Sequence, residues 1–283
     1  CQLKFQDMRF VYGKQMVMYL SLLIICLIIM FILRNNLKSE TSQIRDYPEI
    51  LKEDTLRIVT DYNPLSYYVT QDSIIGFDYE LANLISKRSG LAVLVFPEVS
   101  LSKSLQGLNK NEYDIVGRTL PVTTESKQEY NFTETILLNK QVLIQRKPEF
   151  NNNTKPIRNQ LDLARKTLYI ISDAPTRYRI ENLAHEIGDT IYVKEETKYG
   201  AEQLVIMVAK GDIEFAVINE NIAQQMASEF PEIDYQTDIS FTQFQSWALR
   251  KTSPVLLDSL NVWLKDIKES PEFQILTKKY FGK

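Results

Sequence analysis

The amino-acid sequence predicts an α/β protein that folds into two lobes and is preceded by one membrane-spanning helix. From Leu56 onward, short apolar runs alternate with longer amphipathic ones, which is the pattern of sheets covered by helices. The polar segment KPEFNNNTKP at residues 147–156 interrupts this alternation, which then resumes. Such a break predicts a boundary between two lobes. An uncharged run near the N-terminus stands apart from both lobes.

Composition agrees with a folded chain divided between two environments. The 283 residues are 44% hydrophobic and 24% charged, with 9 Gly, 10 Pro, 2 Cys and 1 His. These values exclude a disordered chain, a collagen-like chain and a disulfide scaffold. The formal net charge of -3 divides into +4 for residues 1–38, which hold five basic residues and one acidic residue, and -7 for the remainder. We therefore expect the two parts to lie in different surroundings.

The uncharged run Met16–Leu33 predicts a membrane anchor. As a helix it would extend roughly 27 Å at about 1.5 Å per residue. A cleavable signal peptide is the main alternative, but the run ends in FILRNN without small residues at a cleavage site. A buried core helix is a further alternative. We expect a cytoplasmic tail at residues 1–15, a single-pass span of the bacterial inner membrane at 16–33 and a linker at 34–54, although the flanking positive charges do not give the orientation.

In the first lobe, the predicted strands alternate with two predicted helices along the chain. Residues Leu56–Thr60 are expected to form a strand, and Phe77–Ser89 a helix that ends at Gly90. A strand at Leu91–Phe96 and a helix at Leu101–Asn109 follow. A strand at Asp114–Val116 and a long apolar run at Ile136–Ile144 complete the lobe before the polar break.

The second lobe repeats this alternation. We expect its strands at Thr167–Ile171, Thr190–Val193 and Glu214–Ile218, and its helices at Pro175–Ile187, Tyr199–Lys210 and Asn221–Phe230. A strand at Gln245–Leu249 and helices at Val255–Lys268 and Glu272–Tyr280 end the chain.

Catalytic groups are scarce in this sequence. His185 is the only histidine and lies within a predicted amphipathic helix, and residues 39–283 contain no cysteine. A zinc site, a Ser-His-acid triad and cysteine catalysis therefore lack their usual groups. Glycine-rich phosphate loops are absent, and the charge of -7 opposes nucleic-acid binding. We expect no catalytic residue, metal ion, cofactor or nucleic-acid partner.

Three segments place polar side chains where strands are expected to end. They are DYNPLSYY (Asp61–Tyr68), GRTLPVTT (Gly117–Thr124) and SDAPTR (Ser172–Arg177). In an open α/β lobe, ligands bind beyond the carboxyl ends of strands and at helix N-termini. Asp61, Tyr62, Tyr67, Arg118 and Thr119 are therefore candidate ligand contacts. Loop packing for the tyrosines and turn capping for the threonines are the alternatives.

The order of these segments resembles a known family. LRIVTDYNPLSYY, IIGFDYELANLISKRSGL, EYDIVGRTLPVTTESKQEYNFTETIL and KGDIEFAVINENIAQQMASEFPEIDYQ appear in sequence, followed by QSWALR and a C-terminal helix pair ending in KKYFGK. Together they resemble the type 2 periplasmic solute-binding proteins for polar amino acids. The likeness is greatest to the binding module of the membrane-bound lytic murein transglycosylase F group, and it covers Leu56–Lys283.

The resemblance implies a type 2 periplasmic-binding-protein fold whose two lobes close on a ligand like a hinged clamp. Two crossover strands would join the lobes, near Lys140–Arg146 and near Thr242–Ala248. Lobe 1 would then comprise residues 55–145 and 243–283, and lobe 2 residues 146–242.

Two positions depart from the family pattern. Where amino-acid binders of the family carry an arginine for the ligand carboxylate, this chain has Ser126, and where they carry an acid for the ammonium it has Asn219. We hypothesise that Arg118 supplies the missing cation, with Arg177 opposite it, and we expect Thr176 to be a further ligand contact. An amino-acid derivative or a muropeptide would suit such a site better than a free amino acid.

The sequence therefore favours a membrane-anchored periplasmic solute-binding protein that closes on a small polar ligand for transport or sensing. Its partners would be that ligand and a membrane transporter or cell-wall enzyme. The resembling transglycosylases carry a catalytic domain with a Glu-Ser motif followed by Gly-Leu-Met-Gln, and neither Glu125-Ser126 nor Glu269-Ser270 is followed by such an element. The alternative is a non-catalytic regulatory relative of those enzymes.

Overall fold

The computed structural model describes residues 18–31, 45–172 and 175–282. Residues 18–31 form a helix whose side chains are exposed. This helix belongs to a different compact unit from the folded part that begins at residue 45. Within the described residues, no helix is long and apolar enough to cross a membrane. Both ends of the predicted span Met16–Leu33, the predicted tail at 1–15 and residues 34–44 of the predicted linker lie outside the described residues.

Lobe 1 is built on a mixed sheet with the strand order β4-β1-β5-β13-β6, in which β7 also pairs with β13. Strand β1 runs parallel to β4 and β5, whereas β13 is antiparallel to its neighbours. The bounds are β1 (Thr55–Thr60), β4 (Ala92–Pro97), β5 (Ile115–Pro121), β6 (Tyr130–Phe132), β7 (Leu137–Asn139) and β13 (Gln243–Arg250).

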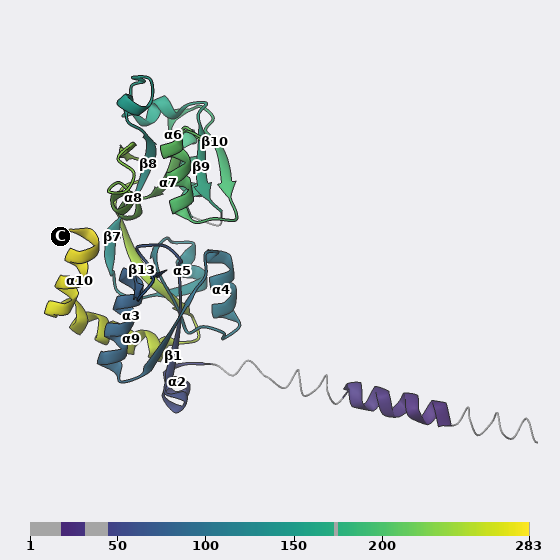
Figure 1. Ribbon diagram of the computed structural model, residues 1–283. Helices are drawn as coiled ribbons and strands as arrows, with labels where there is room; N and C mark the ends of the chain where they lie inside the picture. The colour runs from purple at the N-terminus through teal and green to yellow at the C-terminus, as the bar shows by residue number, and fades with distance from the viewer. Residues whose placement is uncertain (1–17, 32–44, 173–174, 283) are drawn as a thin grey trace, which may run out of the picture. The chain divides into compact units, whose positions relative to one another are not determined.

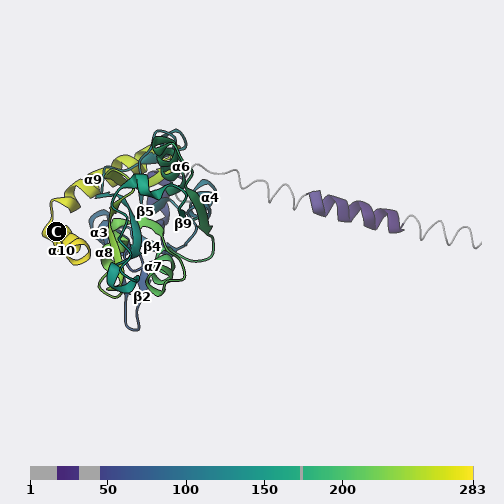
Figure 2. The same ribbon diagram turned by 90° about the horizontal axis from the view of Figure 1, so that it is seen from above.

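Helices cover both faces of this sheet, as the alternating side chains of β1 require. Ile58 packs into a core with α3 (Phe77–Ser89), α9 (Pro254–Lys268) and α10 (Pro271–Phe281), and the next residue, Val59, packs on the opposite face. That opposite face is covered by α4 (Leu101–Asn109). Figures 1 and 2 show α9 and α10 on one side of the lobe and α4 on the other. Successive strand residues point to opposite faces, so an apolar strand such as β1 needs cover on both.

Lobe 2 has its own mixed sheet with the order β10-β9-β11-β8-β12. Helices α7 and α8 pack on one face, with Ile144 and Ala216, and α6 packs on the other, with Leu143 and Val217. The bounds are β8 (Gln141–Arg146), β9 (Thr167–Ile171), β10 (Tyr192–Glu196), β11 (Ala216–Asn219), β12 (Ile233–Asp238), α6 (Thr176–Ile187), α7 (Ala201–Lys210) and α8 (Glu220–Met226).

The chain crosses between the two sheets twice (Figure 1). The first crossing is Lys140, which separates β7 in the first sheet from β8 in the second, and the second is the segment 239–242. Lys140 is held there by Asp238 (Nζ–Oδ1 2.9 Å) and Glu220 (Nζ–Oε1 3.3 Å). The sequence placed residues 55–145 in lobe 1, but β8 pairs with β11 and β12 and so belongs to the second sheet.

Residues 45–53 correct the predicted linker, because they are part of lobe 1. Helix α2 (Tyr47–Glu53) begins with a capping box in which Asp46 and Glu49 satisfy each other's backbone N–H groups. Asp46 also accepts hydrogen bonds from the backbone of Val255 (3.1 Å) and Leu256 (2.8 Å) at the start of α9. Arg45 is buried and forms an ion pair with Asp114 (Nε–Oδ1 2.7 Å). This segment therefore fastens the start of the described lobe to its C-terminal helices.

A small hairpin projects from lobe 1 next to the end of β1. Its strands are β2 (Tyr68–Val69) and β3 (Ile74–Ile75), and it leads into α3 through Gly76. Gly76 has φ +138°, and a Cβ there would lie 2.3 Å from the carbonyl oxygen of Ser66. A glycine is therefore required where the hairpin returns against the loop after β1. The remaining short helical segments are α5 (Ser126–Glu129), Pro148–Phe150 and Gln160–Leu163.

Candidate ligand-binding site

The carboxyl ends of β1 and β5 face lobe 2. The end of β5 pairs with the start of β13, since Pro121 is opposite Gln245, and β13 begins at the second crossing. Because β1 is parallel to β5, its end lies at the same edge. Asn219, at the end of β11 in lobe 2, pairs with Gln141 directly after the first crossing. The residues that follow these strands therefore lie between the lobes, where ligands bind in open α/β sheets.

Asp61 and Arg118 form an ion pair at this edge. Arg118 Nη2 lies 2.8 Å from Asp61 Oδ2, and the two side chains are 12% and 22% exposed. Arg118 Nη1 also donates to the backbone carbonyls of Val99 (3.3 Å) and Glu98 (3.5 Å). Burial raises the pKa of the Asp61 carboxyl, and Arg118 opposes that rise. The guanidinium was expected to face a ligand, but in this structure it is engaged with groups of its own lobe.

The loop after β1 holds a group of tyrosines. Asn63 Oδ1 accepts from the backbone of Leu65 (2.9 Å) and Ser66 (2.7 Å), which fixes the loop as a turn. Tyr62 is 40% exposed and packs against Tyr67, with ring centroids 6.4 Å apart. Tyr67 is itself buried. Of the two predicted tyrosines, Tyr62 therefore has a ring that a ligand can reach, and the buried Tyr67 packs against that ring.

Asp78 is a buried acid that the sequence did not single out. It lies in the first turn of α3, is 2% exposed and accepts a hydrogen bond from Trp247 Nε1 (3.1 Å). Burial raises the pKa of Asp78 to about 7, and the nearby charges of Asp61 and Arg118 act on it in opposite directions. The only sequence signal was its place in GFDYEL, where an acid in a first helical turn is ordinary.

A chain of polar side chains lines the corresponding edge of lobe 2. Thr176 Oγ1 donates to Gln141 Oε1 (3.1 Å), and Gln141 Nε2 donates to Asn219 Oδ1. The structure thus brings together Thr176 and Asn219, two predicted residues 43 positions apart. The glutamine that joins them was not among the predicted residues. Amide and hydroxyl groups at this edge suit a ligand with hydrogen-bonding groups more than a bare charge.

Glu202 adds a carboxylate from the second lobe. It lies in the first turn of α7 and is half-buried, and its Oε1 has no hydrogen-bond partner among the residues the structure describes. The pKa of Glu202 is raised to about 7, chiefly by burial, and Asp61 contributes to the rise. That contribution couples one carboxylate on each lobe, so the charge of the candidate site involves both lobes.

Three further predicted residues take no part in the interactions just described. Ser126 is engaged with Thr123, whose backbone N–H donates to Ser126 Oγ (3.0 Å), so it caps a turn. Thr119 follows Arg118 in β5 and is half-buried. Arg177 pairs with Glu195 (2.5 Å) and Glu181 (3.5 Å) on its own lobe. In this structure, Arg177, which the sequence placed opposite Arg118, is paired with acids of its own lobe.

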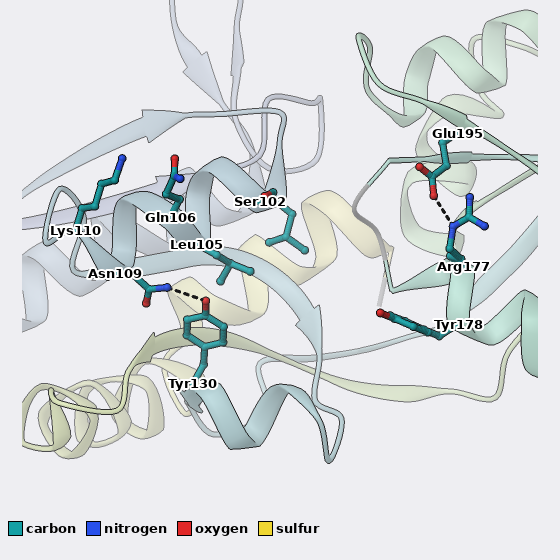
Figure 3. Close-up of a pocket in the computed structure, with 10 residues that line it drawn as sticks. Ser102, Leu105, Gln106, Asn109, Lys110, Tyr130, Arg177, Tyr178 and Glu195 are labelled. Atoms are coloured by element: carbon teal, nitrogen blue, oxygen red, sulfur yellow. Dashed lines mark hydrogen bonds and ion pairs between the residues drawn. The ribbon is translucent and has the colours of Figure 1, made fainter.

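A groove of about 710 Å³ lies between α4 of lobe 1 and the α6–β10 region of lobe 2 (Figure 3). We call it the interlobe groove. It is lined by Leu101, Ser102, Leu105, Gln106, Asn109, Lys110, Tyr130, Arg177, Tyr178 and Glu195. No group of three or more His, Cys, Asp or Glu side chains within the described ranges could hold a metal ion.

Comparison with known proteins identifies what this architecture is similar to. Residues 56–283 match the family described as bacterial extracellular solute-binding proteins, family 3. The membrane-bound lytic murein transglycosylase F of Photobacterium profundum is 24% identical over 247 residues, which cover 86% of this chain and 47% of that protein. The chain thus spans about half the length of this relative. The L-cystine-binding protein TcyA of Bacillus subtilis is 25% identical over 243 residues, 83% of this chain and 84% of that protein.

Solved structures share the fold. An ancestral arginine-binding protein bound to arginine superposes with a TM-score of 0.71 at 20% identity, over 81% of this chain and 99% of that chain. The holo arginine-binding protein from T. maritima gives 0.67 at 21% identity, over 83% and 99%. The predicted two-lobed fold of periplasmic binding proteins is therefore confirmed.

Proposed function

The chain belongs to the bacterial extracellular solute-binding proteins, family 3, and we propose that it binds a small polar ligand between its two lobes. The observation that carries this proposal is the Asp61–Arg118 ion pair at the strand ends that face lobe 2. Glu202, Thr176 and Asn219 stand on the opposing lobe, so a ligand that contacts both sets would favour closure.

The ligand we propose is an amino-acid derivative or a cell-wall peptide. A free amino acid presents a carboxylate, which would have to compete with Asp61 for Arg118. A peptide group instead offers a carbonyl to the remaining N–H groups of Arg118 and an N–H to Asp61, so the pair need not separate. The names of the related proteins, which include an L-cystine-binding protein, agree with a ligand built from amino acids.

We further propose that the apolar N-terminal segment anchors the protein to the bacterial inner membrane, with the two lobes in the periplasm. The described helix at 18–31 carries exposed Leu, Ile, Met and Phe side chains, which supports an apolar environment around it. A fixed anchor suits a fixed partner, such as a transporter or a sensor. We assign no catalytic role to the described residues.

A second candidate function follows from the relatives named lytic murein transglycosylase F. In that case the lobes would be a non-catalytic regulatory module that acts on a cell-wall enzyme.

Ligand-driven closure distinguishes the two functions. Spin labels would be placed on Lys103→Cys in α4 and His185→Cys in α6, both exposed, in a chain whose Cys1 and Cys26 are replaced by serine. For a solute-binding protein, pulsed electron resonance should show a shorter interlobe distance when cell-wall peptides are added. An unchanged distance with every ligand tried would favour the scaffold role.

Replacing Arg118 with alanine should weaken ligand binding by more than tenfold. The variant removes the donors at the strand ends and leaves Asp61 without its counter-charge. Calorimetric titration of the full chain with free amino acids and with cell-wall peptides would measure this. The matched control is Arg165→Ala, which removes an arginine from an exposed pair with Asp189 and should leave affinity unchanged. Tight binding of a free amino acid that survives Arg118→Ala would contradict the proposed ligand class.

A further inference from the structure

The interlobe groove is not used by the site proposed above. Its volume of about 710 Å³ falls within the range of roughly 300–1,000 Å³ that is usual for pockets that bury a drug-sized ligand. Figure 3 shows Tyr178 projecting from α6 toward the face of α4 that carries Ser102 and Leu105. Whatever fills the groove contacts both lobes.

On both lobes, the lining of the groove follows closely in sequence on residues of the candidate ligand site. On lobe 1, Arg118 donates to the carbonyl of Val99, and the groove wall begins two residues later at Leu101. On lobe 2, Thr176 belongs to the polar edge, and the next residue, Arg177, lines the groove. The chain thus leads from the candidate site directly into the groove wall on each lobe.

The lining combines apolar and hydrogen-bonding groups. Leu101 and Leu105 form an apolar strip on α4, and Ser102 and Gln106 provide polar groups beside it. Tyr178 is 72% exposed and has no hydrogen bond or ring contact to any described residue. When a ligand covers a solvent-exposed aromatic ring and the apolar strip facing it, apolar surface is removed from water, which favours binding.

The charges of the groove exclude other classes of ligand. Arg177 is neutralised by Glu195 and Glu181, which leaves Lys110 as the remaining lysine or arginine of the lining. A polyanion such as an oligonucleotide would lack the cations it requires. A lipid chain would bury Gln106 and the Arg177–Glu195 pair against hydrocarbon, which is unfavourable. A short peptide matches both the amide groups and the apolar strip.

We propose, resting on the proposed function above, that the interlobe groove binds the continuation of the ligand, namely one or two further residues of a short peptide whose first residue occupies the site at Asp61 and Arg118. An apolar or aromatic side chain of that continuation packs between Tyr178 and the Leu101–Leu105 strip. Its backbone amides hydrogen-bond to Ser102 and Gln106. The protein accordingly selects peptides over single amino acids.

The test is retention of ligands by the full chain from a mixture of free amino acids and randomised di- and tripeptides, with identification by mass spectrometry. The wild type should retain peptides at least tenfold better than the amino acids they contain. Tyr178→Ala should lose that advantage and hold single amino acids within twofold of the wild type, and Tyr178→Phe should keep it. Tyr192→Ala is the matched control, because Tyr192 is an exposed tyrosine of the same lobe outside the groove.

Each other result overturns the proposal in a distinct way. Retention of single amino acids with no gain for peptides refutes the groove and the proposed ligand class, but leaves the binding of a small polar ligand between the lobes intact. Equal loss of both classes in Tyr178→Ala means that Tyr178 acts as a contact between the closed lobes and not as a subsite. If the wild type retains nothing at millimolar concentrations, the proposed function fails, and the groove proposal fails with it.

Discussion

Asp114→Ala is expected to destabilise lobe 1 by about 3–5 kcal/mol, because it would leave two buried guanidinium groups without their shared counter-charge. Asp114 is fully buried and accepts from Arg45 Nε (2.7 Å), Arg250 Nη2 (3.4 Å) and the backbone N–H of Arg57 (3.0 Å). Arg45 and Arg250 are each 6% exposed. Burial already lowers the pKa of Arg250, and Asp114 is the main group that opposes this effect.

The effect should be measured by chemical denaturation followed by tryptophan fluorescence. Both tryptophans, Trp247 and Trp263, belong to lobe 1, so the signal reports on that lobe. Asp114→Asn keeps an acceptor of the same shape and should fall between wild type and Asp114→Ala.

The control is Asp189→Ala, whose partner Arg165 is 79% exposed. It should change the free energy of unfolding by less than about 1 kcal/mol. Because Arg45 also binds the carbonyl of Thr55 (3.0 Å) next to α2, Asp114→Ala should expose residues 45–53 to proteolysis. Equal destabilisation by the two alanine variants would show that the buried network does not hold the segment.

Elements with clear local signals were predicted with the bounds that the structure has. Helix α3 begins at Phe77 and ends at Ser89, where Gly90 adopts φ 78° and closes it. Helix α4 begins after Ser100, which caps it by accepting from the backbone of Lys103 (3.3 Å). The apolar periodicity of these helices and the residues that cap them all lie within about a dozen residues. A single sequence was therefore sufficient to predict their bounds.

Elements defined by distant partners were predicted poorly. The apolar run at 136–144 was placed in lobe 1 as a whole, yet it contains β7, the crossing residue Lys140 and most of β8. Both strands are apolar, so nothing in the run marks a change of sheet. Helix α2 was assigned to a linker because it lies in a polar, charged stretch, and its contacts through Asp46 reach residues more than 200 positions away.

The candidate site shows the same division. The sequence named Asp61 and Arg118 separately, because each follows a predicted strand, but their mutual ion pair depends on β1 and β5 being neighbours in the sheet. Asp78 and Glu202 were passed over because acids are common in first helical turns. Their significance comes from burial, which is a property of tertiary packing.

Asp78→Asn should gain stability relative to the wild type as the pH rises from acid to alkaline. Burial raises the pKa of Asp78 from 3.8 to about 7 in the folded state, so the folded protein holds a proton that the unfolded chain releases near pH 4. Stability from this group is therefore fully present below pH 3.8 and is lost as pH rises through about 7. Between pH 5 and pH 8 the loss amounts to roughly 2–3 kcal/mol.

Asparagine cannot ionise, so the variant should lack this loss. It keeps an oxygen that can accept from Trp247 Nε1, and its other contacts change by an amount that does not depend on pH. The quantity to measure is the difference in free energy of unfolding between variant and wild type, which should increase in favour of the variant by roughly 2–3 kcal/mol from pH 5 to pH 8. Asp61 and Glu202 titrate in both proteins, and most of their contribution cancels in this difference.

Asp212→Asn, at an exposed position in the turn after α7, is the control for the substitution itself and should change the free energy of unfolding by less than about 0.5 kcal/mol at either pH. Curves that stay parallel for wild type and Asp78→Asn would mean that Asp78 is ionised in the folded protein. In that case Asp61 and Asp78 would both be negatively charged, and Arg118 would have to balance both carboxylates. A diverging pair of curves would instead show that Asp78 is neutral in the folded protein below about pH 7, which leaves Arg118 opposite the single charge of Asp61.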